Sequence, residues 1–166
     1  MKHKSIRTLA LLGLCTAAAM ILSYVESFIP FGVPGLKVGL PNIVILFIIY
    51  KMSWKEAAAV SLVRCVLTSL LFGTVMSLAY SIAGGAVSIT VMALLKKWNK
   101  FSHVGVSIAG GITHNAGQII VAIAVTGVEE IAYYMPVLAL GGTLAGLVIG
   151  VAGAILLKRL DKVKMG

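Results

Sequence analysis

Arg64 is the residue of this sequence that helix packing alone is least able to explain, because it is a charged residue within an apolar run. It follows Lys55 by nine residues, or roughly 13 Å along a helix, and stands in an otherwise uncharged run. An arginine at the centre of a membrane helix costs about 2.5–3.5 kcal/mol, so it must face the protein interior or a wet cavity. Ser61 and Thr68 share its helical face. We predict a guanidinium fork for a ligand carboxylate or phosphate; the alternatives are an ion pair with Glu26, or a guanidinium that holds the carbonyls of a broken helix.

A second polar group gathers in another apolar run, where His114, Asn115 and Gln118 fall within five residues. His114 and Gln118 are one helical turn apart and share a face. Neighbouring glycines remove bulk, so a ligand or another helix can approach closely. These side chains would orient a ligand by hydrogen bonds, or alternatively join two helices. No Asp, Glu or Cys accompanies the histidine, so no metal site is predicted.

The predicted outer loops supply a third group of candidates. Lys37 and Asn42 would contribute near the mouth of a ligand site, and Glu26 is a further candidate ligand contact. Tyr133 and Tyr134, with the turn-rich loop 30–36, would close the site as a lid. The alternative for the tyrosines is anchoring at the membrane interface.

The composition fixes the class of protein that must position these residues. Of 166 residues, 60% are hydrophobic and 11% are charged, whereas soluble domains carry about 25% charged residues. A soluble enzyme, a disordered chain and a nucleic-acid binder are therefore excluded. We predict one all-α domain over residues 1–166, an integral bundle of transmembrane helices in a lipid bilayer.

The apolar runs predict six spans, separated by short charged or turn-forming segments. They cover residues 8–28, 37–51, 55–72, 75–95, 104–128 and 134–157. The second is the weakest, because it holds only 13 uncharged residues and a spanning helix needs about 20.

With six spans, twelve basic residues fall on one side and Lys37 alone falls on the other. The positive-inside rule then places both termini in the cytoplasm, in a multi-pass protein of a bacterial plasma membrane.

Small residues recur at four-residue spacing in two of the spans. The last span carries Gly142, Gly146 and Gly150, and the first carries Gly13 and Ala17. Close backbone approach between membrane helices depends on such residues. They predict either internal packing or a docking face for another membrane protein.

No catalytic constellation is present, and Asp161 is the only aspartate. The sequence has no phosphate-binding loop with a following Lys-Ser/Thr. We therefore predict no catalytic residues, no cofactor and no enzyme, although an intramembrane enzyme stays a third, weaker alternative. Any energy-driven transport would need a partner protein.

Several strings resemble one known family over about residues 8–157. They are Pro34-Gly35-Leu36-Lys37-Val38-Gly39-Leu40-Pro41-Asn42, Arg64, Leu71-Phe72-Gly73-Thr74, Thr113-His114-Asn115-Ala116-Gly117-Gln118 and Tyr133-Tyr134-Met135-Pro136. They resemble the Gx transporter family, also labelled heptaprenyl diphosphate synthase component I. More distantly, six short spans resemble the substrate-binding S components of energy-coupling factor (ECF) transporters.

The two family labels imply different functions. The transporter label implies capture of a small anionic or amphipathic ligand from the outer side. The first span would then dock onto a transmembrane coupling subunit that carries two ATPases. S components often have the pattern Ala-xxx-Ala in this span, and this chain has Gly13-xxx-Ala17. The synthase label implies a role in polyprenyl and quinone metabolism. Prenyl synthases use aspartate-rich motifs, which this chain lacks. The synthase label therefore predicts a non-catalytic membrane partner in this metabolism.

Overall fold

The structure is a computed structural model that describes residues 6–28 and 39–162, without the side chains of 160–162. The described residues form helices and connecting turns. In chain order the elements are α1 (Ile6–Ser27), α2 (Asn42–Lys51), α3 (Trp54–Phe72), α4 (Val75–Trp98), α5 (His103–Thr126), a 3-10 helix η1 (Glu129–Tyr134) and α6 (Met135–Lys162). The predicted all-helical fold is confirmed.

Among the described residues, four helical stretches are long and apolar enough to cross a membrane. They are α1, α4, α5 and the stretch Glu129–Arg159, which joins η1 to α6. These helices indicate a membrane protein, as the composition predicted. The 19-residue α3 carries Lys55, Glu56 and Arg64, and α2 has only ten residues.

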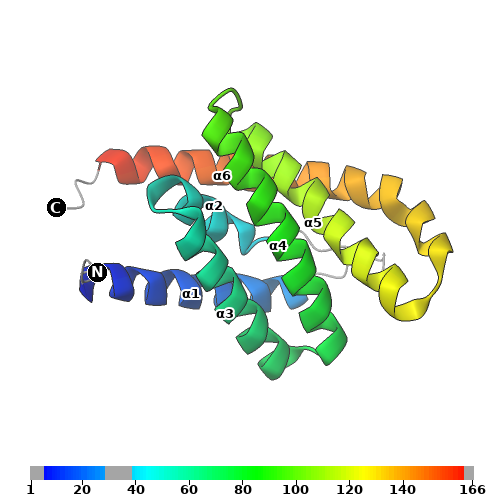
Figure 1. Cartoon of the computed structure of the whole chain (residues 1–166). Helices are drawn as coiled ribbons and strands as arrows, with labels where there is room; N and C mark the ends of the chain where they lie inside the picture. Colours follow the sequence, from blue (N-terminus) through cyan, green and yellow to red (C-terminus); the bar gives the residue numbers. More distant parts are fainter. Residues whose placement is uncertain (1–5, 29–38, 163–166) are drawn as a thin grey trace.

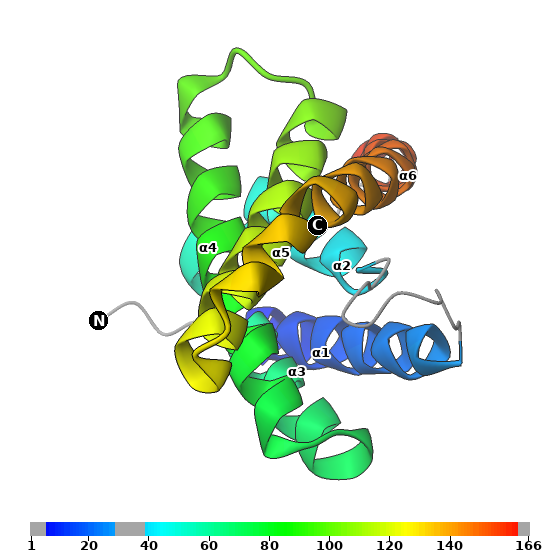
Figure 2. The same cartoon turned by 90° about the vertical axis from the view of Figure 1, so that its right-hand side faces the viewer.

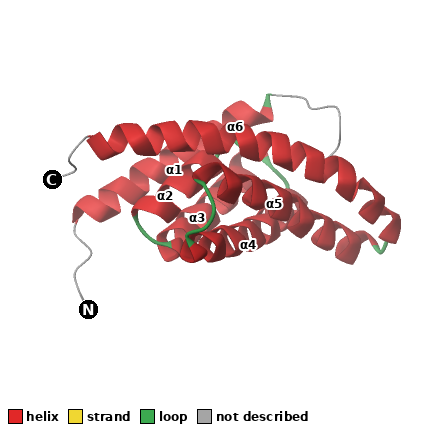
Figure 3. Ribbon diagram, turned by 90° about the horizontal axis from the view of Figure 1, so that it is seen from above, coloured by secondary structure: helices red, strands yellow, loops and turns green. Residues whose placement is uncertain are grey.

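The helices pack around α2, which lies between α1 and α6 (Figure 1). Helix α5 makes the most extensive contacts, with α6 on one side and α4 on another, and α1 packs on α3. Figure 2 shows the same stack of α6, α2 and α1 from the side. Seen from above, α6 and α4 lie toward opposite edges of the molecule (Figure 3). Residues far apart in sequence therefore converge at the start of α2.

Helix α2 is the central element of the core. Every residue from Val44 to Ile49 is buried, so the helix is apolar on all sides, as expected for a helix enclosed by others. Ten residues rise about 15 Å, roughly half of a 30 Å hydrocarbon layer. The predicted second span, 37–51, begins as a helix only at Asn42, and residues 37 and 38 lie outside the described residues.

Lys96 fixes the C-terminal end of α2. Its ammonium group donates a hydrogen bond to the carbonyl oxygen of Ile49 and lies 5.4 Å from the ring centroid of Tyr50. A cation at this position satisfies a terminal carbonyl and interacts favourably with the helix dipole. The basic end of α4 therefore holds one end of α2, and the other end reaches into the interior.

The two sets of small residues have different surroundings. A Cβ atom added at Gly146 would lie 2.6 Å from the Ile108 Cα atom, and one at Gly150 would lie 2.7 Å from Val104 Cα. Gly142 makes a similar approach to α5. Gly13 has nothing within 4 Å of such an atom, and Gly13 and Ala17 are both exposed. The α6 glycines thus pack within the chain, whereas the α1 pair faces outward.

Candidate functional site

A polar pocket of about 350 Å³ opens between α1, α3, α4, α5 and the start of α2. This volume is at the lower end of the roughly 300–1,000 Å³ found for ligand pockets. Its lining is rich in hydroxyl groups and contains both signs of charge. The lining residues are Ser23, Glu26, Ser27, Gly39, Pro41, Asn42, Arg64, Thr68, Ser69, Phe72, Gly73, Ser77, Ser81 and His114.

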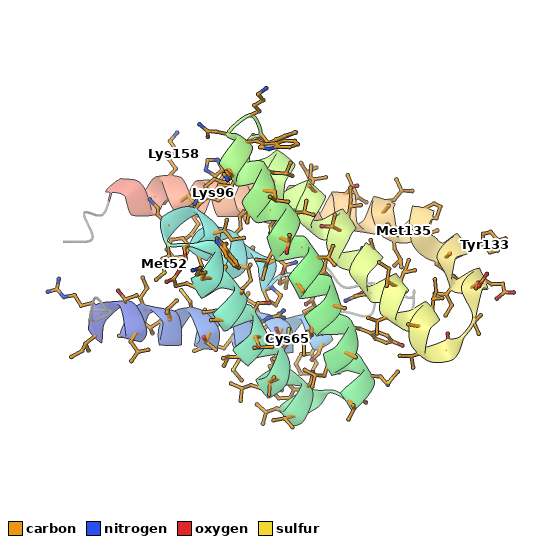
Figure 4. All side chains as sticks on the ribbon, in the orientation of Figure 1. Met52, Cys65, Lys96, Tyr133, Met135 and Lys158 are labelled. Atoms are coloured by element: carbon orange, nitrogen blue, oxygen red, sulfur yellow. The ribbon has the colours of Figure 1, made fainter. Side chains whose placement is uncertain are left out.

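Arg64 is the main cationic group of this pocket. Its side chain is 8% exposed, and Nη1 donates to Ser23 Oγ at 3.1 Å, where α3 crosses α1 near Cys65 (Figure 4). Nη2 is 3.4 Å from the Cys65 sulfur, a weak acceptor. Nε is buried and has no hydrogen-bond partner among the described residues. Arg64 thus has unused hydrogen-bonding capacity among the described residues.

The alternative roles of Arg64 are absent from the described part of the chain. There its guanidinium forms no ion pair with Glu26 and donates to no backbone carbonyl. A buried cation that lacks an opposite charge is costly, and a bound anion would remove much of that cost. This geometry favours ligand binding by Arg64.

Glu26 joins the end of α1 to the start of α2. Its side chain is 9% exposed, and the carboxylate accepts a hydrogen bond from the Gly39 amide. Gly39 has φ +75°, a left-handed conformation that favours glycine, and a Cβ there would also meet the Asn42 amide at 2.9 Å. The chain can therefore turn sharply into α2 and bring Pro41 and Asn42 to the pocket wall. The N-terminal, partially positive end of α2 faces this region.

The three predicted site residues of α5, which are His114, Asn115 and Gln118, have different surroundings in the structure. His114 lines the polar pocket, and its Nε2 lies 3.0 Å from Nε2 of Gln118. Gln118 itself lines a separate, mainly apolar pocket of about 370 Å³. Asn115 donates to the Leu138 carbonyl at 2.7 Å and so joins α5 to α6. Only His114 of the three therefore reaches the polar pocket.

Glycines at the helix crossings make this arrangement possible. A Cβ at Gly84 of α4 would lie 2.7 Å from the His114 carbonyl oxygen, and one at Gly117 would lie 2.9 Å from the Ala83 oxygen. Helices α4 and α5 can approach this closely only because both positions lack side chains. The close crossing places His114 beside α4.

The predicted tyrosine lid is not near the polar pocket. Tyr133 is 83% exposed and lies at the end of the molecule away from Cys65, the neighbour of Arg64 (Figure 4). Tyr134 lines the apolar pocket with Gln118 and Leu138. Lys37 and the loop 30–36 lie outside the described residues.

The hydroxyl lining was missed by sequence reasoning as a group. Ser23 and Ser27 are four residues apart on α1, and Ser77 and Ser81 repeat that spacing on α4. Thr68 follows Arg64 by four residues. A polar stripe at four-residue spacing on three apolar helices was the available signal. Within the described residues, no three His, Cys, Asp or Glu side chains gather where they could hold a metal ion.

One of three comparisons with known proteins identifies a family for this chain. No curated protein and no solved structure matches the chain significantly. The sequence model of one family, described as heptaprenyl diphosphate synthase component I, matches residues 15–156. This range contains all the described residues that line the polar pocket. The chain belongs to the heptaprenyl diphosphate synthase component I family.

Proposed function

We propose that this protein is a non-catalytic membrane binding protein that captures a small ligand with an anionic group from the outer side. It would act as the substrate-binding component of an ECF-like transporter. The observation that carries the proposal is the buried Arg64, which lines a polar pocket of about 350 Å³ and forms no ion pair within the described residues. A guanidinium can donate two parallel hydrogen bonds to a carboxylate or phosphate.

The start of α2 supports the same ligand chemistry. The N-terminal end of a half-helix inside a membrane protein favours negative charge through the helix dipole. Here α2 begins at Asn42, in the pocket wall, and its first amides donate to the carbonyl oxygens of Gly39, Leu40 and Pro41, so the dipole is its contribution. Asn42, His114 and the serine hydroxyls would orient the remaining polar atoms of the ligand.

The direction of capture follows from the proposed topology of six crossings, with both termini in the cytoplasm. The basic residues near Arg7, Lys55, Lys96 and Lys158 all belong to one set of helix ends. The pocket reaches Gly73 and Ser77, at the α3–α4 turn of the opposite set. If the positive-inside rule orients the protein, this end of the pocket faces outward.

Cysteine labelling of intact cells checks this topology. We expect a membrane-impermeant maleimide to label Glu130→Cys in η1, because η1 belongs to the outer end. Lys162→Cys at the end of α6 should react only after the membrane is opened. Cys15 and Cys65 are buried, so the unmodified chain is the background control. Labelling of Lys162→Cys alone in intact cells would contradict the proposal.

Ligand capture and complex formation are tested separately. Native mass spectrometry of protein purified in mild detergent should show a retained small molecule. Co-expression with a coupling subunit and its ATPases should yield a complex through the exposed α1 face. Gly13→Leu should then abolish the complex while the isolated protein still retains its ligand, because Gly13 touches nothing within the chain. A stable complex of Gly13→Leu would exclude this docking face.

The family name favours a second candidate function, a membrane partner of a soluble component II in polyprenyl diphosphate metabolism. A diphosphate would suit Arg64. The pocket is small and polar for a seven-unit prenyl chain, which would have to extend outside it. Co-purification with a soluble prenyl synthase rather than with ATPases would support this candidate.

A further inference from the structure

We propose that the ligand is a small hydroxylated acid, in which hydroxyl groups lie within a few carbon atoms of the carboxylate or phosphate. This inference rests on the proposed binding function and narrows its ligand class. Arg64 binds the acid group, and the ligand hydroxyls donate hydrogen bonds to serine and threonine oxygens of the pocket. Hydroxy acids, sugar acids and sugar phosphates share this chemistry.

Most of the hydroxyl protons in the pocket are already used within the helices. Six hydroxyl side chains line the pocket, and four of them donate their single proton to a carbonyl oxygen three or four residues earlier, at 2.6–2.9 Å. These four are Ser23, Ser27, Thr68 and Ser77. Serine and threonine commonly make such bonds in helices. Toward the pocket these side chains therefore present oxygen lone pairs, which accept hydrogen bonds.

Part of this acceptor capacity is unused. A hydroxyl oxygen can accept two hydrogen bonds. Ser23 accepts one from Arg64, whereas Ser27 and Thr68 accept none from the described residues. A ligand that displaces water from the pocket must supply donors to these oxygens, because otherwise the hydrogen bonds that water made to them are lost.

The accepting oxygens lie on both sides of the group that binds the acid. Ser23 Oγ is 3.1 Å from Arg64 Nη1, and Ser27 follows Ser23 by one turn of α1. Thr68 follows Arg64 by one turn of α3. Residues one turn apart on a helix have Cβ atoms about 5–6 Å apart. Ligand donors that meet Ser27 or Thr68 are therefore a few carbon atoms away from an acid group held by Arg64.

A hydroxyl group suits this lining better than a group that only donates. The pocket also contains donors, in the side-chain amide of Asn42 and in Arg64. A ligand hydroxyl both donates and accepts, so it can serve either kind of neighbour, whereas an ammonium group accepts nothing and adds positive charge near the guanidinium. Phe72 is the only large apolar side chain among the described lining residues, so a long apolar tail finds few partners.

A binding panel tests the proposal on the full-length protein in lipid nanodiscs. The hydroxylated probes are glycolate, glycerate, gluconate and glycerol 3-phosphate. Each is paired with its deoxy acid, which is acetate, propanoate, hexanoate or propyl phosphate, and with its O-methyl ethers, which keep the oxygens but lose their protons. Calorimetry should show at least one hydroxylated acid that binds about 10-fold or more tightly than both partners, because each lost hydrogen bond weakens binding about 2- to 10-fold.

Variants assign the ligand hydroxyls to the pocket oxygens. Thr68→Val removes one accepting oxygen, so it should weaken the hydroxylated acid about 2- to 10-fold while the deoxy acid binds at least as tightly as before. Arg64→Lys should weaken both probes. Thr90→Val is the matched control and should change neither. Thr90 makes the same type of bond, to the carbonyl oxygen of Ala86, but it is exposed on α4 and lies outside the polar pocket.

The outcomes separate this inference from the proposed function. If deoxy acids or O-methyl ethers bind as tightly as the hydroxylated acids, or if no hydroxylated acid binds, the hydroxylated-acid proposal is wrong. The anion site would still stand if Arg64→Lys weakened the deoxy acids or released the ligand that co-purifies. If Arg64→Lys changes neither, the proposed function fails as well. The probe comparison uses the unmodified protein, so it holds even if Thr68→Val does not fold.

Discussion

Arg64→Ala should abolish ligand retention and leave the helices folded. The substitution removes the cationic group that lines the pocket. Arg64→Lys should keep the charge and lose the fork, so affinity should fall by about 1.5–3 kcal/mol, or roughly 10- to 100-fold. The fold loses one charged hydrogen bond to Ser23, worth about 1.5–3 kcal/mol, but is relieved of a buried charge without an ion pair in the described residues. Native mass spectrometry and thermal unfolding measure the two effects.

The matched control for this prediction is Arg159→Ala. Arg159 is exposed near the end of α6, so its loss removes the same type of side chain away from the pocket. Ligand retention and thermal stability should both stay unchanged. Ligand binding by Arg64 would be contradicted if Arg64→Ala destabilised the fold by about 3–5 kcal/mol, if Glu26→Gln rescued that loss, and if ligand retention stayed unchanged. Those results would indicate a structural ion pair between Arg64 and Glu26.

Gly146→Leu should prevent correct packing of α6 on α5. A Cβ at this position already lies 2.6 Å from Ile108 Cα and 2.8 Å from the Ser107 carbonyl oxygen, and backbone atoms cannot move aside like a flexible side chain. Gly146→Ala should cost about 1–3 kcal/mol or more through overpacking, and leucine more still. Size-exclusion chromatography and thermal unfolding in detergent should show aggregation or a strongly lowered Tm.

Gly13→Leu is the control for Gly146→Leu, since it makes the same change in another apolar helix. Gly13 has no neighbour within 4 Å of an added Cβ, so the isolated protein should stay monodisperse with an unchanged Tm. Equal damage from both variants would mean that leucine is harmful for a reason other than the α5–α6 contact.

The helices were largely predictable from the sequence because their signals are local. The predicted span 55–72 differs from helix α3, Trp54–Phe72, by one residue, and the predicted span 75–95 begins with helix α4, Val75–Trp98. The boundary between them was predictable because Gly73 and Thr74 interrupt the apolar run. The second span was predicted to begin at residue 37, yet α2 begins at Asn42. Charge counting predicted an even number of crossings but carried no information about where a helix starts. The turn at Gly39 is held by Glu26, which is 13 residues away in sequence.

The site was predictable only in part, for a related reason. The sequence singled out Arg64, which lines the polar pocket, because a charged side chain deep in a membrane helix has few explanations. Asn115 and Gln118 were grouped with His114 by sequence proximity, but their directions depend on how α5 crosses its neighbours. Close contact at Gly117 turns one face of α5 toward α4, and the bond from Asn115 to Leu138 turns another toward α6. Such rotations are properties of tertiary packing.

The half-length of α2 also has an electrical consequence. In the proposed orientation, its buried start lies about half-way through the hydrocarbon layer, so a ligand in the pocket has crossed roughly half of the transmembrane voltage. Moving one elementary charge through 100 mV changes its free energy by about 2.3 kcal/mol, so an anion held at mid-depth shifts by about half that amount. A zwitterion with both charges at similar depth experiences almost no net shift. The voltage sensitivity of capture therefore reports the net charge of the captured molecule.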